Sequence, residues 1–203
     1  MVPAAETWSL APNTMTTTKS DGPLSPGQQE ELALANARAQ KILAATKVAT
    51  FNGWTIGAFA AITLPFALVS LTALVIGVGM AIVARNEFRG RGLLRRFDHQ
   101  GPQLLGRNQV GFMTLIIGYC VWSIYSAITH PIPQLEELEA AMGATAGLVT
   151  NLTVAVYSVV IVLTLVFQGL NARYYFARIK LVQGYLEETP AWIIDLQRAT
   201  AVL

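Results

Sequence analysis

Three long stretches of the chain contain no charged residue and no histidine: Val48–Ala84, Asn108–Thr129 and Ala140–Ala172. A stretch of about 18 or more residues without charge is typical of a membrane-spanning helix. A large soluble all-α core would need a polar face on each of these helices, and the three stretches have none. The pattern therefore predicts an all-α integral membrane protein.

The first of these stretches is too long for one span. As a single helix, Val48–Ala84 would reach about 55 Å, whereas the hydrocarbon layer of a bilayer is about 30 Å thick. Pro65 disfavours helix in Leu64 and is itself well placed in a first helical turn, so we expect a break between the two. The sequence thus predicts four transmembrane helices arranged as two antiparallel hairpins, at about residues 48–64, 65–84, 110–128 and 148–167.

The basic residues predict the orientation of these spans. All 14 Lys and Arg residues lie in segments 1–47, 85–109 and 168–203, whereas segment 129–147 carries glutamates and no basic residue. An excess of Lys and Arg on cytoplasmic segments is the positive-inside rule. We therefore expect both termini and the 85–109 loop to be cytoplasmic.

The two ends of the chain differ in composition from the spans. Residues 1–24 are rich in Thr, Pro, Ala and Ser and have no apolar run, which predicts a disordered cytoplasmic tail. Residues 25–47 predict a cytoplasmic amphipathic helix whose apolar face could pack on the C-terminal segment or lie on the bilayer. The region between them, residues 48–172, forms the transmembrane part, and residues 173–203 predict cytoplasmic C-terminal helices.

The start of the N-terminal helix carries a clear signal. Ser25 is a candidate N-cap, Gln28 can close a capping box with it, and Pro26 stands at the first helical position. We therefore expect the helix to begin at Pro26.

Small residues recur at every fourth position in both helices of the first predicted hairpin. Such ladders let helix backbones approach closely in lipid, although Gly and Ala are also simply common in membrane helices. The candidate helix-packing residues are Gly53, Gly57, Ala61, Ala73, Gly77 and Ala81.

Segment 86–100, NEFRGRGLLRRFDHQ, concentrates arginines beside the membrane. Orientation alone would explain them, but juxtamembrane basic clusters also attract anionic lipid headgroups, at about 1 kcal/mol per charge. A nucleotide site is not expected, because GRG lacks the third glycine of a dinucleotide fingerprint and no GxxxxGK[ST] motif occurs. A net charge of only +2 argues against nucleic acid. The candidate residues for a lipid headgroup or a protein partner are Arg89, Arg91, Arg95 and Arg96.

Signals for catalysis, metals and cofactors are weak. Cys120 is the single cysteine and lies within a predicted span, and His99 and His130 fall on opposite sides of the membrane, so we expect no disulfide, metal or cofactor. No GxSxG or HExxH motif appears. Asp98 and His99 beside Glu87 could serve a lipid-modifying enzyme, but such residues in a basic loop are more often simply solvated. We expect no catalytic residue.

Transport is a further possibility. Ion-coupled carriers usually place ionisable residues within the membrane, and the predicted spans contain none. Polar residues near the helix ends could reach water, cap helices or form an interhelical hydrogen-bond cluster. A small passive channel or transporter is therefore the alternative function. These polar residues are Asn52, Thr55, Asn108, Gln109, Asn151, Gln168 and Asn171.

Four pieces of the sequence, NEFRGR, LLGRNQ, GLNARYYFARIK and YLEETPAWIIDLQR, are similar to those of an uncharacterised family of small four-span bacterial inner-membrane proteins. The resemblance covers most of the chain after about residue 33. It implies a bacterial inner-membrane location, and it carries over no functional residue because the family has no assigned activity.

The composition agrees with a membrane protein, since 53% of residues are hydrophobic and 13% charged, against about 25% charged in soluble domains. We expect a non-enzymatic scaffold or accessory subunit of a membrane complex. Its expected partners are membrane lipids and either further copies of itself or other membrane-protein subunits, and no nucleic acid.

Overall fold

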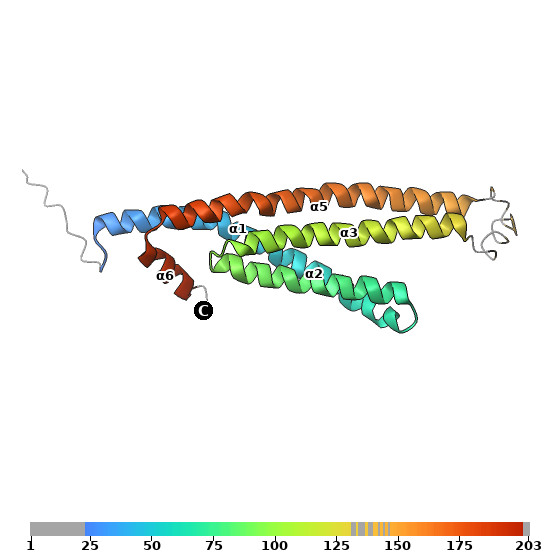
Figure 1. The fold of residues 1–203 in the computed structure, drawn as a ribbon, viewed down its shortest axis with the longest axis horizontal. Coiled ribbons are helices and arrows are strands. Elements are labelled where there is room, and N and C mark those ends of the chain that lie inside the picture. Colours follow the sequence, from blue (N-terminus) through green and yellow to red (C-terminus); the bar gives the residue numbers. More distant parts are fainter. Residues whose placement is uncertain are drawn as a thin grey trace, which may run out of the picture.

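The structure, a computed structural model, describes residues 23–130 and 147–200, together with residues 133, 137, 140, 141, 143 and 145. Nearly all of the predicted disordered tail, 1–24, and most of the predicted external segment, 129–147, lie outside the described residues. The described part is helical (Figure 1), with α1 Pro26–Thr63, the 3-10 helix η1 Leu64–Leu68, α2 Leu71–Arg95, α3 Gln100–Thr129, α5 Leu148–Glu188 and α6 Ala191–Thr200.

Four helices of the described part are long and apolar enough to cross a membrane: α1 with η1, α2, α3 and α5. The predicted all-α class and the predicted set of four span-length helices are thereby confirmed. The helices also run well past the uncharged stretches. At 38 and 41 residues, α1 and α5 are about 57 and 62 Å long, twice the thickness of the hydrocarbon layer.

The start of α1 follows the predicted capping signal. Ser25 is the N-cap, its Oγ accepts a hydrogen bond from the Gln28 backbone N–H at 3.3 Å, and its own N–H donates to Gln28 Oε1 at 2.9 Å. Because these bonds satisfy backbone groups that have no partner within the helix, they fix the first turn at Pro26.

The turn between the first two helices differs from the prediction. The expected second helix began at Pro65, whereas Leu64–Leu68 forms a 3-10 helix and α2 begins at Leu71. Ser70 supplies the reason, because its extended backbone and its Oγ, 3.2 Å from the Ala73 backbone N–H, cap the first α-turn there.

The expected 85–109 loop is mostly helical. α2 continues to Arg95 and α3 begins at Gln100, so the connection is a tight turn over residues 96–99. Phe97 has a φ of 53° within this turn, in the left-handed region that non-glycine residues rarely adopt. Its buried ring stacks on Tyr185 of α5 with ring centroids 4.6 Å apart, and this contact helps to hold the turn against the bundle.

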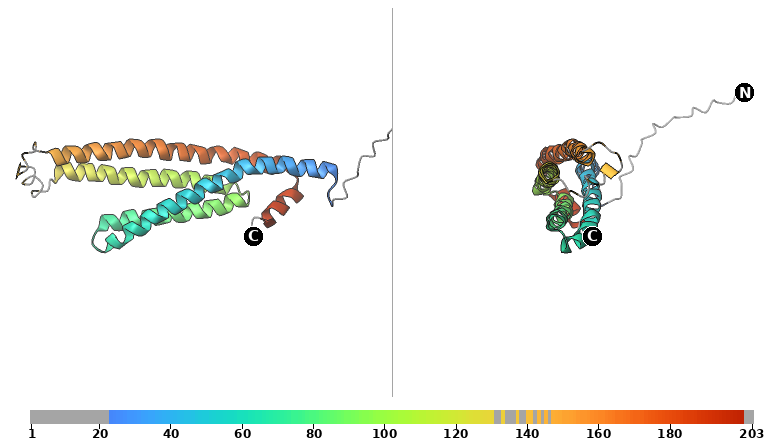
Figure 2. Two further views of the ribbon diagram at one scale, coloured as in Figure 1. Left: turned by 180° about the vertical axis from the view of Figure 1, so that it is seen from behind. Right: turned by 90° about the vertical axis from the view of Figure 1, so that its right-hand side faces the viewer.

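The main core lies at the charged end of the molecule. There α1, α2, α3, α5 and α6 meet (Figure 2). Ile193 and Ile194 of α6 are buried in this contact. The N-terminal part of α1 packs on this C-terminal segment, which answers the question that the sequence left open. The core residues are Ala35, Ala39, Ile42, Ala45, Ala49, Leu94, Phe97, Leu105, Tyr175, Val182, Tyr185, Ile193 and Ile194.

The opposite end, which has no basic residue, is open. α1 packs along α2 and α3 packs along α5, and the two pairs diverge away from the charged end (Figure 1). In the most apolar 18-residue stretch of each span-length helix, only 6–22% of the residues are buried inside the molecule. Most of the apolar surface of these helices therefore makes no contact with the rest of the described chain.

Candidate functional site

A carboxyl group is buried between three helices where the uncharged stretch of α2 ends. Glu87, three residues after Ala84, has no exposed surface. Its Oε1 accepts hydrogen bonds from Asn108 Nδ2 and Gln109 Nε2 of α3, both at 2.7 Å. The Tyr175 hydroxyl of α5 donates to Oε2 at 3.4 Å. In the described part of the chain no Lys, Arg or His pairs with this carboxyl group, so neutral donors alone compensate its burial.

The hydrogen bonds around this carboxyl group join α2, α3 and α5, and a polar side chain of α1 lies beside them. Asn108 Nδ2 also donates to the Val83 carbonyl oxygen at 2.9 Å, and its Oδ1 accepts from Asn86 Nδ2 at 3.2 Å. Asn52 of α1 lies beside Tyr175, and its buried Nδ2 has no acceptor among the described residues. We call this set the polar cluster, and its members are Asn52, Asn86, Glu87, Asn108, Gln109 and Tyr175.

The polar cluster includes part of the predicted set of polar residues. Asn52, Asn108 and Gln109 come together, which is the interhelical arrangement considered for them. Gln168 is not joined to them, and its buried Oε1 has no hydrogen-bond partner in the described part. The side chains of Thr55, Asn151 and Asn171 form no hydrogen bond with the polar cluster among the described residues.

Glu87 was missed as a buried residue because its segment was interpreted as a solvated loop. With α2 running to Arg95, Glu87 instead falls on the buried face of the helix. The sequence signal was helical spacing: the buried positions of α2 continue at intervals of three or four residues past the end of the uncharged stretch. The buried residues of α2 are Gly77, Val83, Ala84, Glu87, Gly90 and Leu94.

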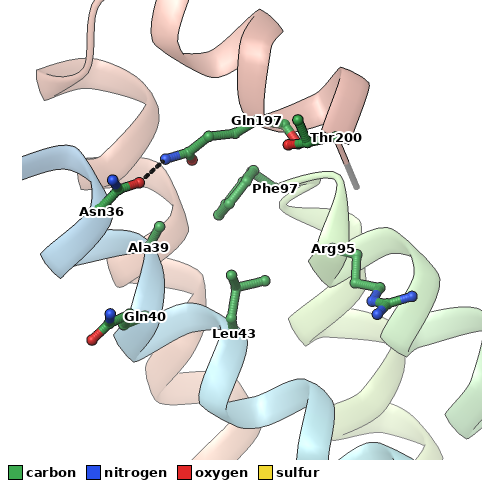
Figure 3. A pocket seen from close by; sticks show the side chains of 8 residues that line it. All are labelled: Asn36, Ala39, Gln40, Leu43, Arg95, Phe97, Gln197 and Thr200. Atoms are coloured by element: carbon green, nitrogen blue, oxygen red, sulfur yellow. Dashed lines mark hydrogen bonds between the residues drawn. The ribbon is translucent and has the colours of Figure 1, made fainter. Parts of the chain in front are cut away.

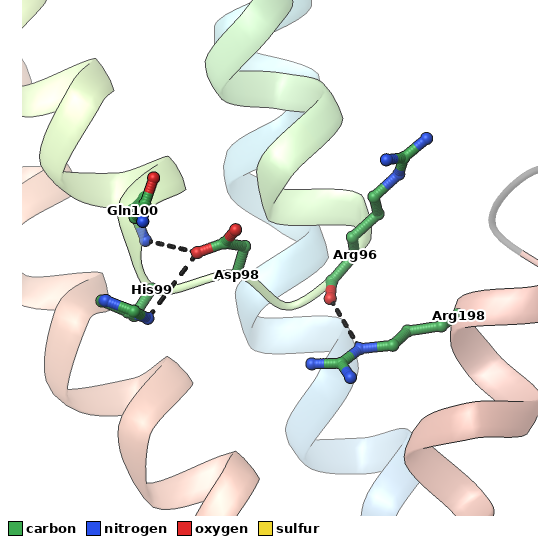
Figure 4. A network of polar contacts seen from close by, with 5 residues as sticks. All are labelled: Arg96, Asp98, His99, Gln100 and Arg198. Carbon is green, nitrogen blue, oxygen red and sulfur yellow. Dashed lines mark hydrogen bonds and ion pairs between the residues drawn. The ribbon is translucent and has the colours of Figure 1, made fainter.

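The structure does not bring Glu87 together with Asp98 and His99. Asp98 Oδ1 accepts from the Gln100 backbone N–H at 2.8 Å at the start of α3, and His99 Nδ1 lies 3.6 Å from the same oxygen (Figure 4). Both belong to the partly exposed turn, whereas Glu87 bonds to α3 and α5 inside the bundle. The enzyme hypothesis required the three to act together, so this geometry does not support it.

The predicted headgroup arginines spread along the end of α2. Arg89, Arg95 and Arg96 are exposed and Arg91 is half-buried, and no described residue bonds to their guanidinium groups. Arg95 lies at the edge of a pocket of about 430 Å³ between α1, α6 and the turn, and the Phe97 ring points into this pocket (Figure 3).

Arg96 lines a different pocket, of about 660 Å³, between the turn, the end of α5 and α6. Its carbonyl oxygen, rather than its side chain, bonds with α6, where it accepts from Arg198 Nε at 3.1 Å (Figure 4). The four arginines therefore do not converge on one binding site.

The predicted packing residues differ in their surroundings. A Cβ added at Gly53 would lie 3.0 Å from the Phe88 ring of α2, and one at Gly57 would lie 3.7 Å from Ala84 Cβ. Gly77 approaches Leu64 of η1, with 3.1 Å from an added Cβ to Leu64 Cδ2. Ala73 and Ala81 are half-buried, and Ala61 is exposed.

Closer contacts occur at glycines that the ladders did not include. An added Cβ would lie 2.5 Å from Leu105 Cγ at Gly90 and 2.6 Å from the Phe176 ring at Gly106. At these two positions α2 approaches α3 and α3 approaches α5 closely beside the polar cluster. Gly79, earlier in α2, is nearly as close to α3, with 2.7 Å between an added Cβ and Leu115 Cδ2.

The remaining candidate chemistry is limited. Cys120 is a free thiol buried on α3. Among the described residues, no group of three His, Cys, Asp or Glu side chains is placed to hold a metal ion. Comparisons with known protein families, with curated proteins and with solved structures find no match to this chain.

Proposed function

We propose that this chain is a non-enzymatic multi-pass protein of the bacterial inner membrane that acts as a scaffold or accessory subunit of a membrane complex. One observation carries the proposal. The tightly packed core lies at the charged end, while the apolar windows of the span-length helices are only 6–22% buried inside the molecule. Helices held at one end and open along their apolar faces suit association with lipid and with other membrane helices.

In this proposal the charged end is cytoplasmic. The pairs α1–α2 and α3–α5 form two antiparallel transmembrane hairpins, and both termini lie inside. The segregation of all 14 basic residues supports this orientation, because the uncharged stretches separate them from segment 129–147. The parts of α1 and α5 beyond the membrane, with α6, then form a cytoplasmic platform.

Site-specific photo-crosslinking in native membranes tests the scaffold role. A photoreactive residue at Val159 or Val166, two exposed positions on α5, should crosslink to a discrete protein in at least one case, either another copy of the chain or a different membrane protein. The same residue at the buried Ala172 is the matched control and should give no intermolecular product. A chain that crosslinks only to lipid at every exposed apolar position of α5 would contradict the proposal.

A small transporter is the second candidate, and Glu87 is the observation that favours it. Ionisable groups buried among membrane helices without a cation commonly mark proton or ion pathways, and Glu87 would stand at the cytoplasmic end of such a pathway. In proteoliposomes with an internal pH-sensitive dye, a transporter should show proton flux that Glu87→Gln abolishes. No flux from the parent chain above that of empty liposomes would exclude proton coupling through this residue.

A further inference from the structure

Four exposed arginines surround the polar cluster on the outside of the bundle: Arg85, Arg89, Arg107 and Arg173. We call them the arginine collar. Arg85 and Arg89 flank Glu87 on α2. On α3, Arg107 directly precedes Asn108.

The hydrogen bonds of the polar cluster place these arginines at one level of the molecule. Glu87 bonds to Asn108 of α3 and to Tyr175 of α5, so these three residues lie side by side. Arg173 is two residues from Tyr175, about 3 Å along the helix. Three helices therefore present guanidinium groups around one cross-section of the bundle.

The guanidinium groups of the arginine collar have no protein partner among the described residues. The side-chain hydrogen bonds and ion pairs of arginine in this part of the chain involve Arg38, Arg178 and Arg198. Each member of the collar therefore keeps its N–H donors available for a ligand from outside the chain.

The arginine collar also lies at the edge of the uncharged stretches. Arg85 directly follows Ala84, and Arg173 directly follows Ala172. The interfacial layer is about 5–8 Å thick on each side of the hydrocarbon, and one helical residue rises about 1.5 Å. The collar thus falls at headgroup depth, including Arg89, about 7.5 Å from Ala84 along the helix.

The arginines at the end of α2 lie farther from the edge of the uncharged stretch than the arginine collar does. Arg95 and Arg96 are about 16 and 18 Å beyond Ala84 along the helix direction. A tilt of 40° would still leave them about 12–14 Å from the hydrocarbon edge, outside the interfacial layer. Each of these arginines carries the same single charge as a member of the arginine collar, so depth is the property that distinguishes the two places.

We propose that the arginine collar binds the phosphate groups of anionic lipid headgroups, and that Arg95 and Arg96 do not. The inference rests on the proposed membrane orientation, and it holds whether or not the chain has a protein partner. A planar guanidinium group donates two parallel hydrogen bonds to phosphate oxygens, which adds geometric preference to the charge attraction.

A lipid-retention experiment tests the proposal on the full-length chain in mild detergent. Native mass spectrometry compares bound phosphatidylglycerol with phosphatidylcholine of identical acyl chains. The parent chain should prefer the anionic lipid, and Arg85→Gln/Arg107→Gln should lower that preference about 30-fold, at about fivefold per charge. The matched pair Arg95→Gln/Arg96→Gln removes the same charge and should behave like the parent.

No preference of the parent for the anionic lipid, or an equal loss in both pairs of variants, would overturn the proposal. Inorganic phosphate at the same concentration should not displace the lipid, and displacement would identify a site for free anions instead. The pair Arg85→Lys/Arg107→Lys keeps the charges needed for insertion and should retain several-fold less phosphatidylglycerol than the parent. Retention of phosphatidylglycerol equal to that of the parent in this lysine pair would contradict binding through paired hydrogen bonds.

Discussion

At the scale of single residues, Glu87 is the least expected feature of this chain. A carboxyl group without exposed surface and without a cation is costly unless its oxygens accept hydrogen bonds. Asn108 and Gln109 provide two short bonds and Tyr175 a longer one, all from neutral groups. The arrangement makes Glu87 an acceptor that ties α2 to α3 and α5.

Two substitutions separate the acceptor role of Glu87 from its charge. Glu87→Gln keeps an oxygen for the two amide donors and removes the charge, so its thermal unfolding temperature in detergent should equal or exceed that of the parent. Glu87→Ala removes the acceptor of the buried Asn108 and Gln109 N–H groups, so it should lower the free energy of unfolding by about 1–3 kcal/mol. Equal destabilisation by both changes would show that the charge itself is required.

At the scale of the elements, close approach of α2 to α3 decides how the helices pack. Gly90 leaves room for the fully buried Leu105, whereas Gly92, on the same helix, has nothing within 4 Å of an added Cβ. The two glycines therefore form a matched pair with the same helix propensity and different surroundings.

Alanine at these two glycines should have opposite effects. Gly92→Ala should be neutral or stabilising by up to about 1 kcal/mol, because alanine favours helix. Gly90→Ala should destabilise the protein by about 1–3 kcal/mol through overpacking against Leu105. Thermal unfolding of both variants in the same detergent measures the difference, and similar values would mean that the α2–α3 approach is looser than the structure shows.

Docking of α6 provides a second comparison at this scale. Ile193 is fully buried in the core, while Leu196 on the same helix is 47% exposed. Ile193→Ala should cost about 2–5 kcal/mol and release α6 to limited proteolysis, whereas Leu196→Ala should leave it protected. Equal protection in both variants would show that the hydrogen bonds of Gln197 to Asn36 and Tyr185 hold the helix by themselves.

At the scale of the whole molecule, orientation in the membrane is the property to establish. Single cysteines at Glu31, Gln100, Glu137 and Glu187 in a Cys120→Ala background occupy exposed positions. In intact cells with a permeabilised outer membrane, an impermeant thiol reagent should label only the cysteine at position 137. External labelling at position 31 would mean an odd number of spans before the 96–99 turn, and the first hairpin would be wrong.

The sequence alone determined the properties that depend on local order along the chain. Hydrophobicity and length identify the span-length helices, because a segment must satisfy its backbone hydrogen bonds within itself to cross a membrane. The capping box at Ser25 was equally predictable, since its hydrogen bonds join residues three positions apart. The N-cap of α2 at Ser70 is equally local, but the proline at position 65 predicted a break in the helix five residues earlier.

Tertiary structure decided the features that depend on contacts between distant segments. Glu87 becomes buried because one face of α2 meets residues 21, 22 and 88 positions away in the chain. The same contacts keep α2 helical past the uncharged stretch, which carries Arg95 and Arg96 away from the level of the polar cluster and gathers Arg85, Arg107 and Arg173 around it. The number of basic residues follows from the sequence. Which of them lie at the same depth in the membrane depends on how the helices pack.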